Sequence, residues 1–301
     1  MAVAAVAAAA VMIGIAGCSS SSSGTEDSTI HAVAAENEYA DVLSQVGGHY
    51  VSVSAIMSDP NTDPHTYEAS PAVAKELRDA TLVVQNGLGY DDFMSKLEQA
   101  SPVNGRKVVV AQQVLGLPDS TPNPHLWYDP KTMPAVAKAI ADDLGTLQPA
   151  HKDEFEKNAA AFTASLQPWL TALASFAKTH PATPVAVTEP VADYMLQAAG
   201  TDIKTPWTLQ AAIMNDTDPS PQDSTLQDSL LSGKQVKVFL YNQQVTDDTT
   251  SKYLALSKSH GIPVVGVYET MPTGYTYQRW MTAELDAMSK AVTDGTSTEK
   301  L

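Results

Sequence analysis

Thr81-Leu82-Val83-Val84-Gln85-Asn86 is a short apolar run that ends at Gly87-Leu88-Gly89, and a stretch with helical spacing follows from Tyr90 to Gln99. A bounded apolar run of this length predicts a buried strand, and the glycines predict the turn that leads into a helix. The same strand–turn–helix unit recurs along most of the chain. Strands that alternate with helices predict parallel α/β sheets.

Further strands are expected at residues 31–35, 50–56, 107–111, 184–188, 236–241 and 262–268, and further helices at 39–46, 71–79, 191–199, 249–260 and 277–292. Lys152 to Lys178 is different, because it is a long run of helix formers without glycine. It predicts one long helix in which Pro168 is the expected position of any kink.

The expected architecture is therefore two α/β lobes with parallel sheets, bridged by one long rigid helix. The N-terminal lobe is expected to span residues 30–148, the bridging helix 149–181 and the C-terminal lobe 182–301.

The composition limits the possible partners. The chain has 301 residues, is 44% hydrophobic, and carries 34 acidic against 18 basic side chains, a net charge of −16. This balance argues against nucleic-acid binding, which needs a basic surface. It fits a cationic ligand, and it also fits an ordinary acidic surface with no ligand.

Residues 1–18 form a separate segment. Ala2 to Ile15 is an apolar run that is too short to span a membrane and is typical of a secretory signal. Ile15-Ala16-Gly17-Cys18, followed by a Ser/Gly-rich tether over residues 19–29, resembles a bacterial lipoprotein processing site at which Cys18 is lipidated. The alternative is an unmodified cysteine in a cleaved leader.

Lipidation at Cys18 would hold the protein on the outer face of the cell membrane without a transmembrane helix. Signals normally carry a positive charge before the apolar run, and none is present here. The sequence thus leaves open whether the true start lies upstream of Met1. Cys18 is the only cysteine, so the mature chain has neither a disulfide nor a thiolate metal ligand.

Two histidines follow prolines in similar loops. They lie in Asp63-Pro64-His65-Thr66-Tyr67-Glu68 and in Asn123-Pro124-His125-Leu126-Trp127-Tyr128-Asp129. Proline stiffens each loop, and imidazole is a common ligand of zinc and similar metals. The pattern predicts a preorganised metal site. The alternative is that both histidines only pack their loops.

Two carboxylates are the best candidates from the second lobe. Glu189 follows the strand expected at 184–188, and Glu269 follows the strand expected at 262–268. Ligand sites in parallel sheets lie at the carboxyl ends of strands. Glu189 could instead be a carboxylate at a helix N-terminus, and Glu269 a surface turn residue. Glu68 and Asp129 are expected to support the site, with Trp127, Tyr128 and Trp280 packing around it.

The ordered motifs resemble a known family. The two histidine loops, Val83 to Asp91 between them, and the closing segments Ile262 to Val267 and Tyr275 to Met281 are similar to those of the cluster A-I metal-binding lipoproteins. These are the zinc and manganese receptors of ATP-binding cassette (ABC) importers. The resemblance runs from about Ile30 to the C-terminus and implies two α/β lobes on one long helix, with the metal ion between them.

Carried over residue by residue, the resemblance implies a ligand set of His65, His125, Glu189 and Glu269. The fourth position is more often Asp in the family, so the longer Glu269 side chain leaves the coordination geometry open. The resemblance also implies one divalent ion as cargo, Mn²⁺ or Zn²⁺, a membrane permease as partner, and a monomer without enzyme activity.

The choice between the two ions is open. Nitrogen and oxygen ligands suit zinc, and carboxylates also suit manganese. No histidine lies between His65 and His125, and Glu189 stands where zinc receptors often have histidine. These two absences favour manganese. Rival functions are a metal-dependent hydrolase, although no HExxH helix is present, and a surface adhesin.

Overall fold

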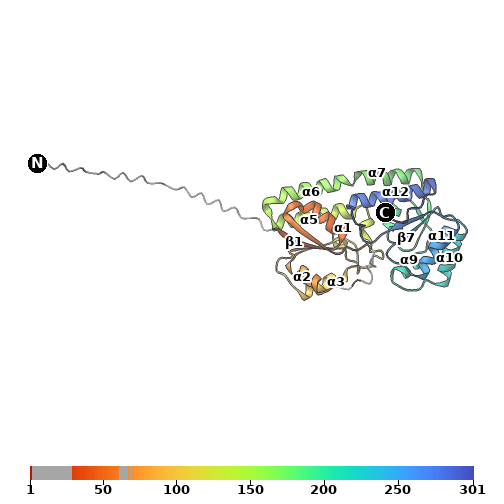
Figure 1. Ribbon diagram of the computed structural model, residues 1–301, viewed down its shortest axis with the longest axis horizontal. Coiled ribbons are helices and arrows are strands. Elements are labelled where there is room, and N and C mark those ends of the chain that lie inside the picture. Colours follow the sequence, from red (N-terminus) through yellow and green to blue (C-terminus); the bar gives the residue numbers. More distant parts are fainter. Residues whose placement is uncertain (2–28, 61–66, 68–69) are drawn as a thin grey trace.

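The computed structural model of the chain describes Met1, residues 29–60, Tyr67 and residues 70–301. The described residues form two lobes, each built on a four-stranded parallel sheet (Figure 1). The first sheet contains β1 (Ile30–Glu36), β2 (Val51–Met57), β3 (Leu82–Gln85) and β4 (Lys107–Val110). The second contains β5 (Pro184–Val187), β6 (Asp202–Ile203), β7 (Val238–Asn242) and β8 (Val264–Val267). The predicted fold class is confirmed.

The two sheets have the same topology. Their strand orders are β2-β1-β3-β4 and β6-β5-β7-β8, and all pairs are parallel. In each sheet the strand order reverses at the first strand, between β1 and β3 in one lobe and between β5 and β7 in the other. Ligands of open parallel sheets bind at the carboxyl ends of strands near such reversals. The residues that follow β1 and β3 in one sheet and β5 and β7 in the other are therefore the first to inspect, together with those after β8, which pairs with β7.

Helices cover both sheets (Figure 1). In the first lobe they are α1 (Asn37–Gly47), α2 (Pro71–Asp79), α3 (Asp92–Ala100), α4 (Ala111–Val114) and α5 (Thr132–Leu147). In the second lobe they are α8 (Asp193–Ala198), α9 (Trp207–Met214), α10 (Pro221–Ser232), α11 (Asp248–Ser259) and α12 (Tyr277–Asp294).

The long bridging helix is present and is bent as the proline predicts. It consists of α6 (Lys152–Ser165) and α7 (Gln167–Thr179), which run end to end along both lobes (Figure 1). The break lies at Leu166, and Pro168 follows within the first turn of α7. Because proline has no backbone N–H, it is tolerated in the first turn of a helix but not in its interior. The helix therefore divides just before Pro168.

Four helices and one strand were not predicted: α4, α5, β6, α9 and α10. The longest of them, α5, had a readable signal. Its buried residues Met133, Val136, Ala137, Ile140, Ala141 and Leu144 recur at the three- and four-residue spacing of an amphipathic helix. The others are short, or, like α10, present few apolar residues to pattern.

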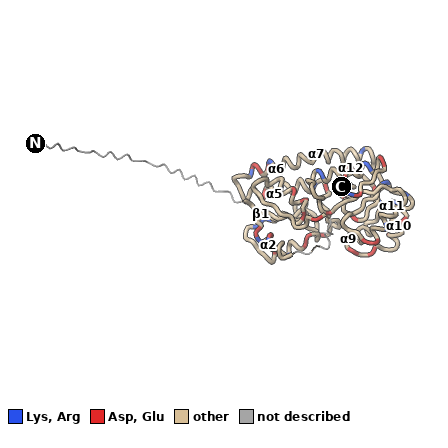
Figure 2. The backbone as a smooth tube through the Cα atoms, in the orientation of Figure 1, with Lys and Arg blue, Asp and Glu red and all other residues tan. Residues whose placement is uncertain are grey.

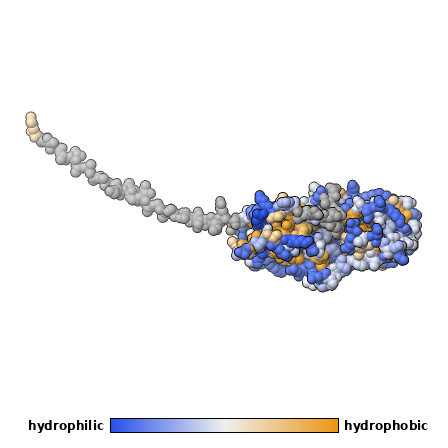
Figure 3. All heavy atoms as spheres, turned by 90° about the horizontal axis from the view of Figure 1, so that it is seen from below, coloured by the Kyte–Doolittle hydropathy of each residue, from blue (hydrophilic) through white to orange (hydrophobic). Residues whose placement is uncertain are grey.

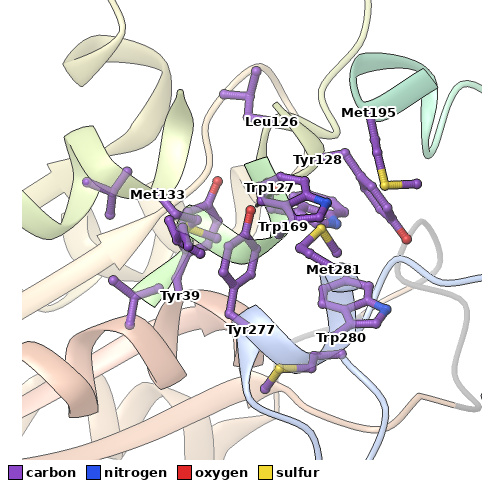
Figure 4. Close-up of a cluster of buried hydrophobic side chains, with 14 of the residues drawn as sticks. Tyr39, Leu126, Trp127, Tyr128, Met133, Trp169, Met195, Tyr277, Trp280 and Met281 are labelled. Carbon is purple, nitrogen blue, oxygen red and sulfur yellow. Dashed lines mark hydrogen bonds between the residues drawn. The ribbon is translucent and has the colours of Figure 1, made fainter. Parts of the chain in front are cut away.

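The two lobes share one hydrophobic core, whose aromatic centre is drawn in Figure 4. Trp127 of the first lobe, Trp169 of α7 and Tyr277 of α12 are all buried there. The Tyr277 hydroxyl donates to the Trp127 carbonyl oxygen at 2.6 Å, and the Trp169 and Tyr277 rings meet edge to face with centroids 6.2 Å apart. The lobes are thus packed together and not only joined by a helix.

Helix α1 of the first lobe also holds the start of α12. The Asp41 carboxylate accepts a hydrogen bond of 2.8 Å from the Tyr277 backbone N–H, one of the donors that a helix start leaves without a partner in the helix. Next to it, the Gln45 and Gln278 side-chain amides exchange two hydrogen bonds of 3.1 and 2.7 Å. These contacts fix the orientation of the second lobe against the first.

The surface is acidic and mixed in polarity. Asp and Glu lie on both lobes among fewer Lys and Arg (Figure 2). On the face shown in Figure 3, hydrophobic patches are interspersed with hydrophilic side chains. Within the part of the chain that the structure describes, no helix combines the length and apolarity needed to cross a bilayer.

Candidate metal site between the lobes

His125 lies in the loop before a short 3-10 helix (Leu126–Tyr128) and is fully buried. Its Nδ1 is 2.8 Å from Asn123 Oδ1, and Asn123 Nδ2 donates to the Pro190 carbonyl oxygen at 2.8 Å. The second bond fixes the amide, since only its NH₂ can donate to a carbonyl. Asn123 Oδ1 therefore faces the imidazole as an acceptor, and Nδ1 carries the proton. Nε2 is then the ring nitrogen left to face the other lobe, an arrangement typical of metal-binding histidines, in which the second nitrogen donates to a supporting acceptor.

Glu269 faces His125 Nε2 from the other lobe. It follows β8 and is fully buried. Its Oε2 lies 3.2 Å from His125 Nε2 and accepts a hydrogen bond of 3.0 Å from the Tyr90 hydroxyl. The Gln244 Oε1 atom accepts from the backbone N–H groups of Glu269 and Thr270, at 2.6 and 2.8 Å. The carboxylate is thus held at both its backbone and its side chain.

Glu189 comes from another strand end of the second lobe. It follows β5 and is 2% exposed. The Asn242 side chain, at the end of β7, joins it to Glu269. Its Nδ2 donates to Glu189 Oε1 at 3.1 Å and to Glu269 Oε1 at 2.7 Å. Both second-lobe candidates therefore lie at the carboxyl edge of the sheet, as the strand-end rule predicts.

Aromatic rings enclose the imidazole. The Trp127 ring meets His125 edge to face with centroids 5.3 Å apart, and the Tyr90 ring does so at 5.8 Å. Burial raises the pKa of the Tyr90 hydroxyl well above its usual value, and the nearby Glu269 raises it further. Tyr90 therefore stays protonated and acts as a hydrogen-bond donor. The expected packing role of Trp127 agrees with this arrangement. The Tyr128 and Trp280 rings pack edge to face, with centroids 5.5 Å apart, and Tyr128 also lies next to Trp127.

The structure brings together three of the four sequence-predicted residues: His125, Glu189 and Glu269. His65, Glu68 and Cys18 lie outside the described residues. Apart from residues 2–28, 61–66 and 68–69, no three His, Cys, Asp or Glu side chains form a cluster that could itself hold a metal ion. The Asn242 amide lies between the two carboxylates.

The His125 loop does not follow a strand directly. Helix α4 and a loop of 10 residues (115–124) separate it from β4. The loop reaches the site because the Asn86 side chain, just after β3, donates to the Pro124 carbonyl oxygen at 2.8 Å.

Sequence reasoning missed most of the residues that support the site. They are Tyr90, Asn123, Asn242 and Gln244. Asn242 could have been predicted from the sequence. It is the last residue of β7, and a position at a strand end is what singled out Glu189. Glu36 and Glu38 were also missed. Burial raises the pKa of both carboxyls well above the usual value, and Glu269 adds to the effect on Glu38. No local pattern signals a buried acid of this kind.

A pocket of about 490 Å³ opens between the lobes beside the site. Its first-lobe wall includes Leu88, Gly89 and Tyr90, and its second-lobe wall includes Trp207 and Met214. Trp207 is exposed at its edge. Tyr90 lines the pocket and also reaches Glu269, so the pocket lies next to the buried carboxylate.

The family of the chain is established by comparison. The family model described as "Zinc-uptake complex component A periplasmic" matches residues 32–291. That match covers most of the sequence, and the chain belongs to this family.

Curated relatives match over shorter stretches. The chain is 28% identical to the manganese-binding lipoprotein MntA of Bacillus subtilis over 158 residues, which is 50% of this chain and 51% of that protein. It is 30% identical to the zinc-binding protein TroA of Treponema pallidum over 134 residues, 42% of each chain. The match thus spans about half the length of such relatives or less.

Solved structures confirm the fold over almost the whole chain. The periplasmic zinc-binding protein TroA from Treponema pallidum superposes with a TM-score of 0.74 at 19% identity, covering 87% of this chain and 98% of that one. A Mn-bound periplasmic metal-binding protein from Candidatus Liberibacter asiaticus gives 0.71 at 17% identity, with the same coverage. At these identities the likeness concerns the fold.

Proposed function

We propose that the chain is an extracytoplasmic solute-binding lipoprotein that captures one divalent transition-metal ion, Mn²⁺ or Zn²⁺, and delivers it to an ABC importer. The observation that carries the proposal is the contact between His125 Nε2 and Glu269 Oε2 across the lobe interface, at 3.2 Å. A nitrogen lone pair and a carboxylate oxygen repel each other unless a proton or a cation lies between them. Two ligand atoms about 2 Å from one tetrahedral ion lie roughly 3.3 Å apart.

The proposed ligands are His65, His125, Glu189 and Glu269. His125 and His65 belong to the first lobe and the two carboxylates to the second, so the bound ion would join the lobes. Because the lobes share a core and are joined by a long helix, we expect their relative orientation to change only slightly when the ion binds. The names of the relatives MntA and TroA, which specify manganese and zinc, support the class of cargo.

The anchor and the division of the chain belong to the same proposal. Residues 1–18 serve as the signal, Cys18 carries the lipid, and residues 19–29 are the tether. The lobes span residues 30–148 and 182–301, with the bridging segment at 149–181. The protein acts as a monomer on the outer face of the cell membrane, where it meets the permease. The lipoprotein names of several relatives support this location.

A transport role fits the ligand count better than catalysis does. A catalytic zinc ion usually keeps one position open for water and has three protein ligands. Four protein ligands would close the site, and a closed site binds and releases its ion without activating water. We therefore propose that the chain is not an enzyme.

Calorimetric titration of the purified chain with Mn²⁺ and with Zn²⁺ tests the function. We expect one tight site per chain, and His125→Ala should weaken binding by more than about a hundredfold, beyond the ~10–100-fold effect of removing a supporting residue. His260→Ala is the matched control. That histidine is half-buried directly after the end of α11, and its ring contacts Ser259 and Leu256, which are neighbours on the same helix. Absence of a tight site for either ion in the wild type would rule out the proposed function.

A further inference from the structure

Asn242 is placed to control how the two carboxylates bind an ion. Its side chain is fully buried, and its Oδ1 accepts a hydrogen bond of 2.9 Å from the Gln244 backbone N–H. That bond fixes the orientation of the amide, so the NH₂ group faces Glu189 and Glu269. The group has two N–H bonds, and each carboxylate receives one of them.

The amide gives the two oxygens of Glu269 different surroundings. Oε1 is turned toward Asn242 Nδ2 at 2.7 Å, whereas Oε2 is turned toward His125 Nε2 at 3.2 Å. Glu189 likewise directs its Oε1 to the same nitrogen, at 3.1 Å. A carboxylate that binds a cation through both oxygens must point both at the ion. The Oε1 of either glutamate would then have to serve both the ion and the Asn242 N–H, which weakens it as a ligand, or give up a hydrogen bond that is costly to break in a buried site.

We propose that Asn242 is a specificity-determining residue that limits Glu189 and Glu269 to one coordinating oxygen each. This inference rests on the proposed function. Two imidazoles and two single oxygens make a four-coordinate set, which suits Zn²⁺. Mn²⁺ prefers more oxygen ligands, which two-oxygen carboxylate binding would supply. Asn242 therefore favours zinc, in the opposite direction to the preference drawn from the missing histidines.

Two substitutions test whether the effect of Asn242 comes from its N–H donors or from the size of its side chain. Asn242→Leu keeps a similar size and removes both N–H donors. Asn242→Asp keeps an oxygen for the Gln244 N–H but replaces the donors with an acceptor, and it adds one more oxygen ligand. Asn158→Leu is the matched control, because Asn158 also donates to one buried partner, the Val46 carbonyl oxygen, but lies on α6 away from the site.

The experiment measures dissociation constants for Mn²⁺ and Zn²⁺ by competition with a chelator, together with X-ray absorption at the zinc edge. We expect the ratio of the Mn²⁺ to the Zn²⁺ constant to fall by at least about tenfold in both Asn242 variants and to stay constant in Asn158→Leu. The zinc coordination number should rise from four in the wild type to five or six in the variants.

The outcomes distinguish the inference from the proposed function. If the wild type binds neither ion, the proposed function fails. If the wild type binds but the ratio stays within twofold in a folded Asn242 variant, only the role of Asn242 is overturned. Thermal melting shows which variants fold. If Asn242→Leu does not, Asn242→Asp decides, since it retains the contact with Gln244. A wild type that binds zinc with six ligands also overturns the inference.

Discussion

Replacing Glu269 with alanine is expected to weaken metal binding by roughly a thousandfold, or about 4 kcal/mol. The carboxylate is fully buried, where a charge acts on a cation with little screening by water. Its loss also removes one partner each from His125, Tyr90 and Asn242. The effect should therefore exceed the ~10–100-fold cost typical of a residue that only supports a ligand.

The loss of metal affinity in Glu269→Ala can be measured as a loss of stabilisation of the folded protein by the ion. At a free-ion concentration about 1,000 times the wild-type dissociation constant, binding stabilises the native state by about 4.1 kcal/mol, and a thousandfold weaker site gains only ~0.4 kcal/mol. The metal-induced rise in melting temperature should therefore nearly vanish. Glu156→Ala is the control, since Glu156 is an exposed partner of Lys152 on α6. An unchanged rise in Glu269→Ala would exclude this residue from the ligand set.

Replacing Glu284 with glutamine is expected to stabilise the protein in mildly alkaline solution. Glu284 lies on α12 and is 1% exposed, and burial raises the pKa of its carboxyl to about 8. The Trp280 indole N–H and the Tyr128 hydroxyl donate to its Oε1, at 3.0 and 3.3 Å. Among the described residues its Oε2 has no hydrogen-bond partner. The neutral acid is therefore the form that the folded protein prefers.

The sign follows from that preference. A carboxyl whose pKa is higher in the folded state favours folding below its unfolded pKa, and this contribution is lost as the pH rises through about 8. The loss is on the order of 4 kcal/mol. Glutamine is neutral at every pH, so Glu284→Gln should match the wild type near pH 5 and exceed its free energy of unfolding above pH 8.

Urea denaturation at pH 5, 7 and 8.5 measures this difference. Other buried acids, including Asp193 with a pKa of about 7, also make the wild type depend on pH, but they are shared by both proteins. The difference between the two proteins in the pH dependence of the free energy of unfolding therefore reports on Glu284 alone. Glu299→Gln serves as a control at an exposed partner of Lys258. Parallel curves for the wild type and Glu284→Gln would show that Glu284 is charged in the folded protein.

The fold was predictable where local pattern and burial agree. The strand at 81–86 and the helix at 71–79 are confirmed nearly to the residue, as β3 and α2. The kink before Pro168 is also confirmed, because it follows from one missing N–H group. The strand β6 has two residues and carries no pattern of its own. It exists because β5 offers an edge to pair with.

The site was predictable only in part. Glu189 and Glu269 could be placed at a sheet edge, because strand ends in parallel sheets converge. The Asn242 amide between them could not, because its role depends on the distance between two residues 80 positions apart. Neither could the support of His125 by Asn123, whose orientation is set by a carbonyl group of the other lobe. Sequence gives the ligand types, and tertiary contacts give their orientation. His65 stays a prediction.

The shared core has a consequence for how the chain acquires its structure. The same buried cluster contains Ile30 near one end of the described chain and Ala291 near the other. Tyr277 and Trp280 complete the packing around Trp127, and Asp41 caps a helix that begins more than 230 residues later. The first lobe therefore cannot reach its final packing during synthesis. Folding waits for the last helix, and either lobe made alone would expose an aromatic surface prone to aggregation.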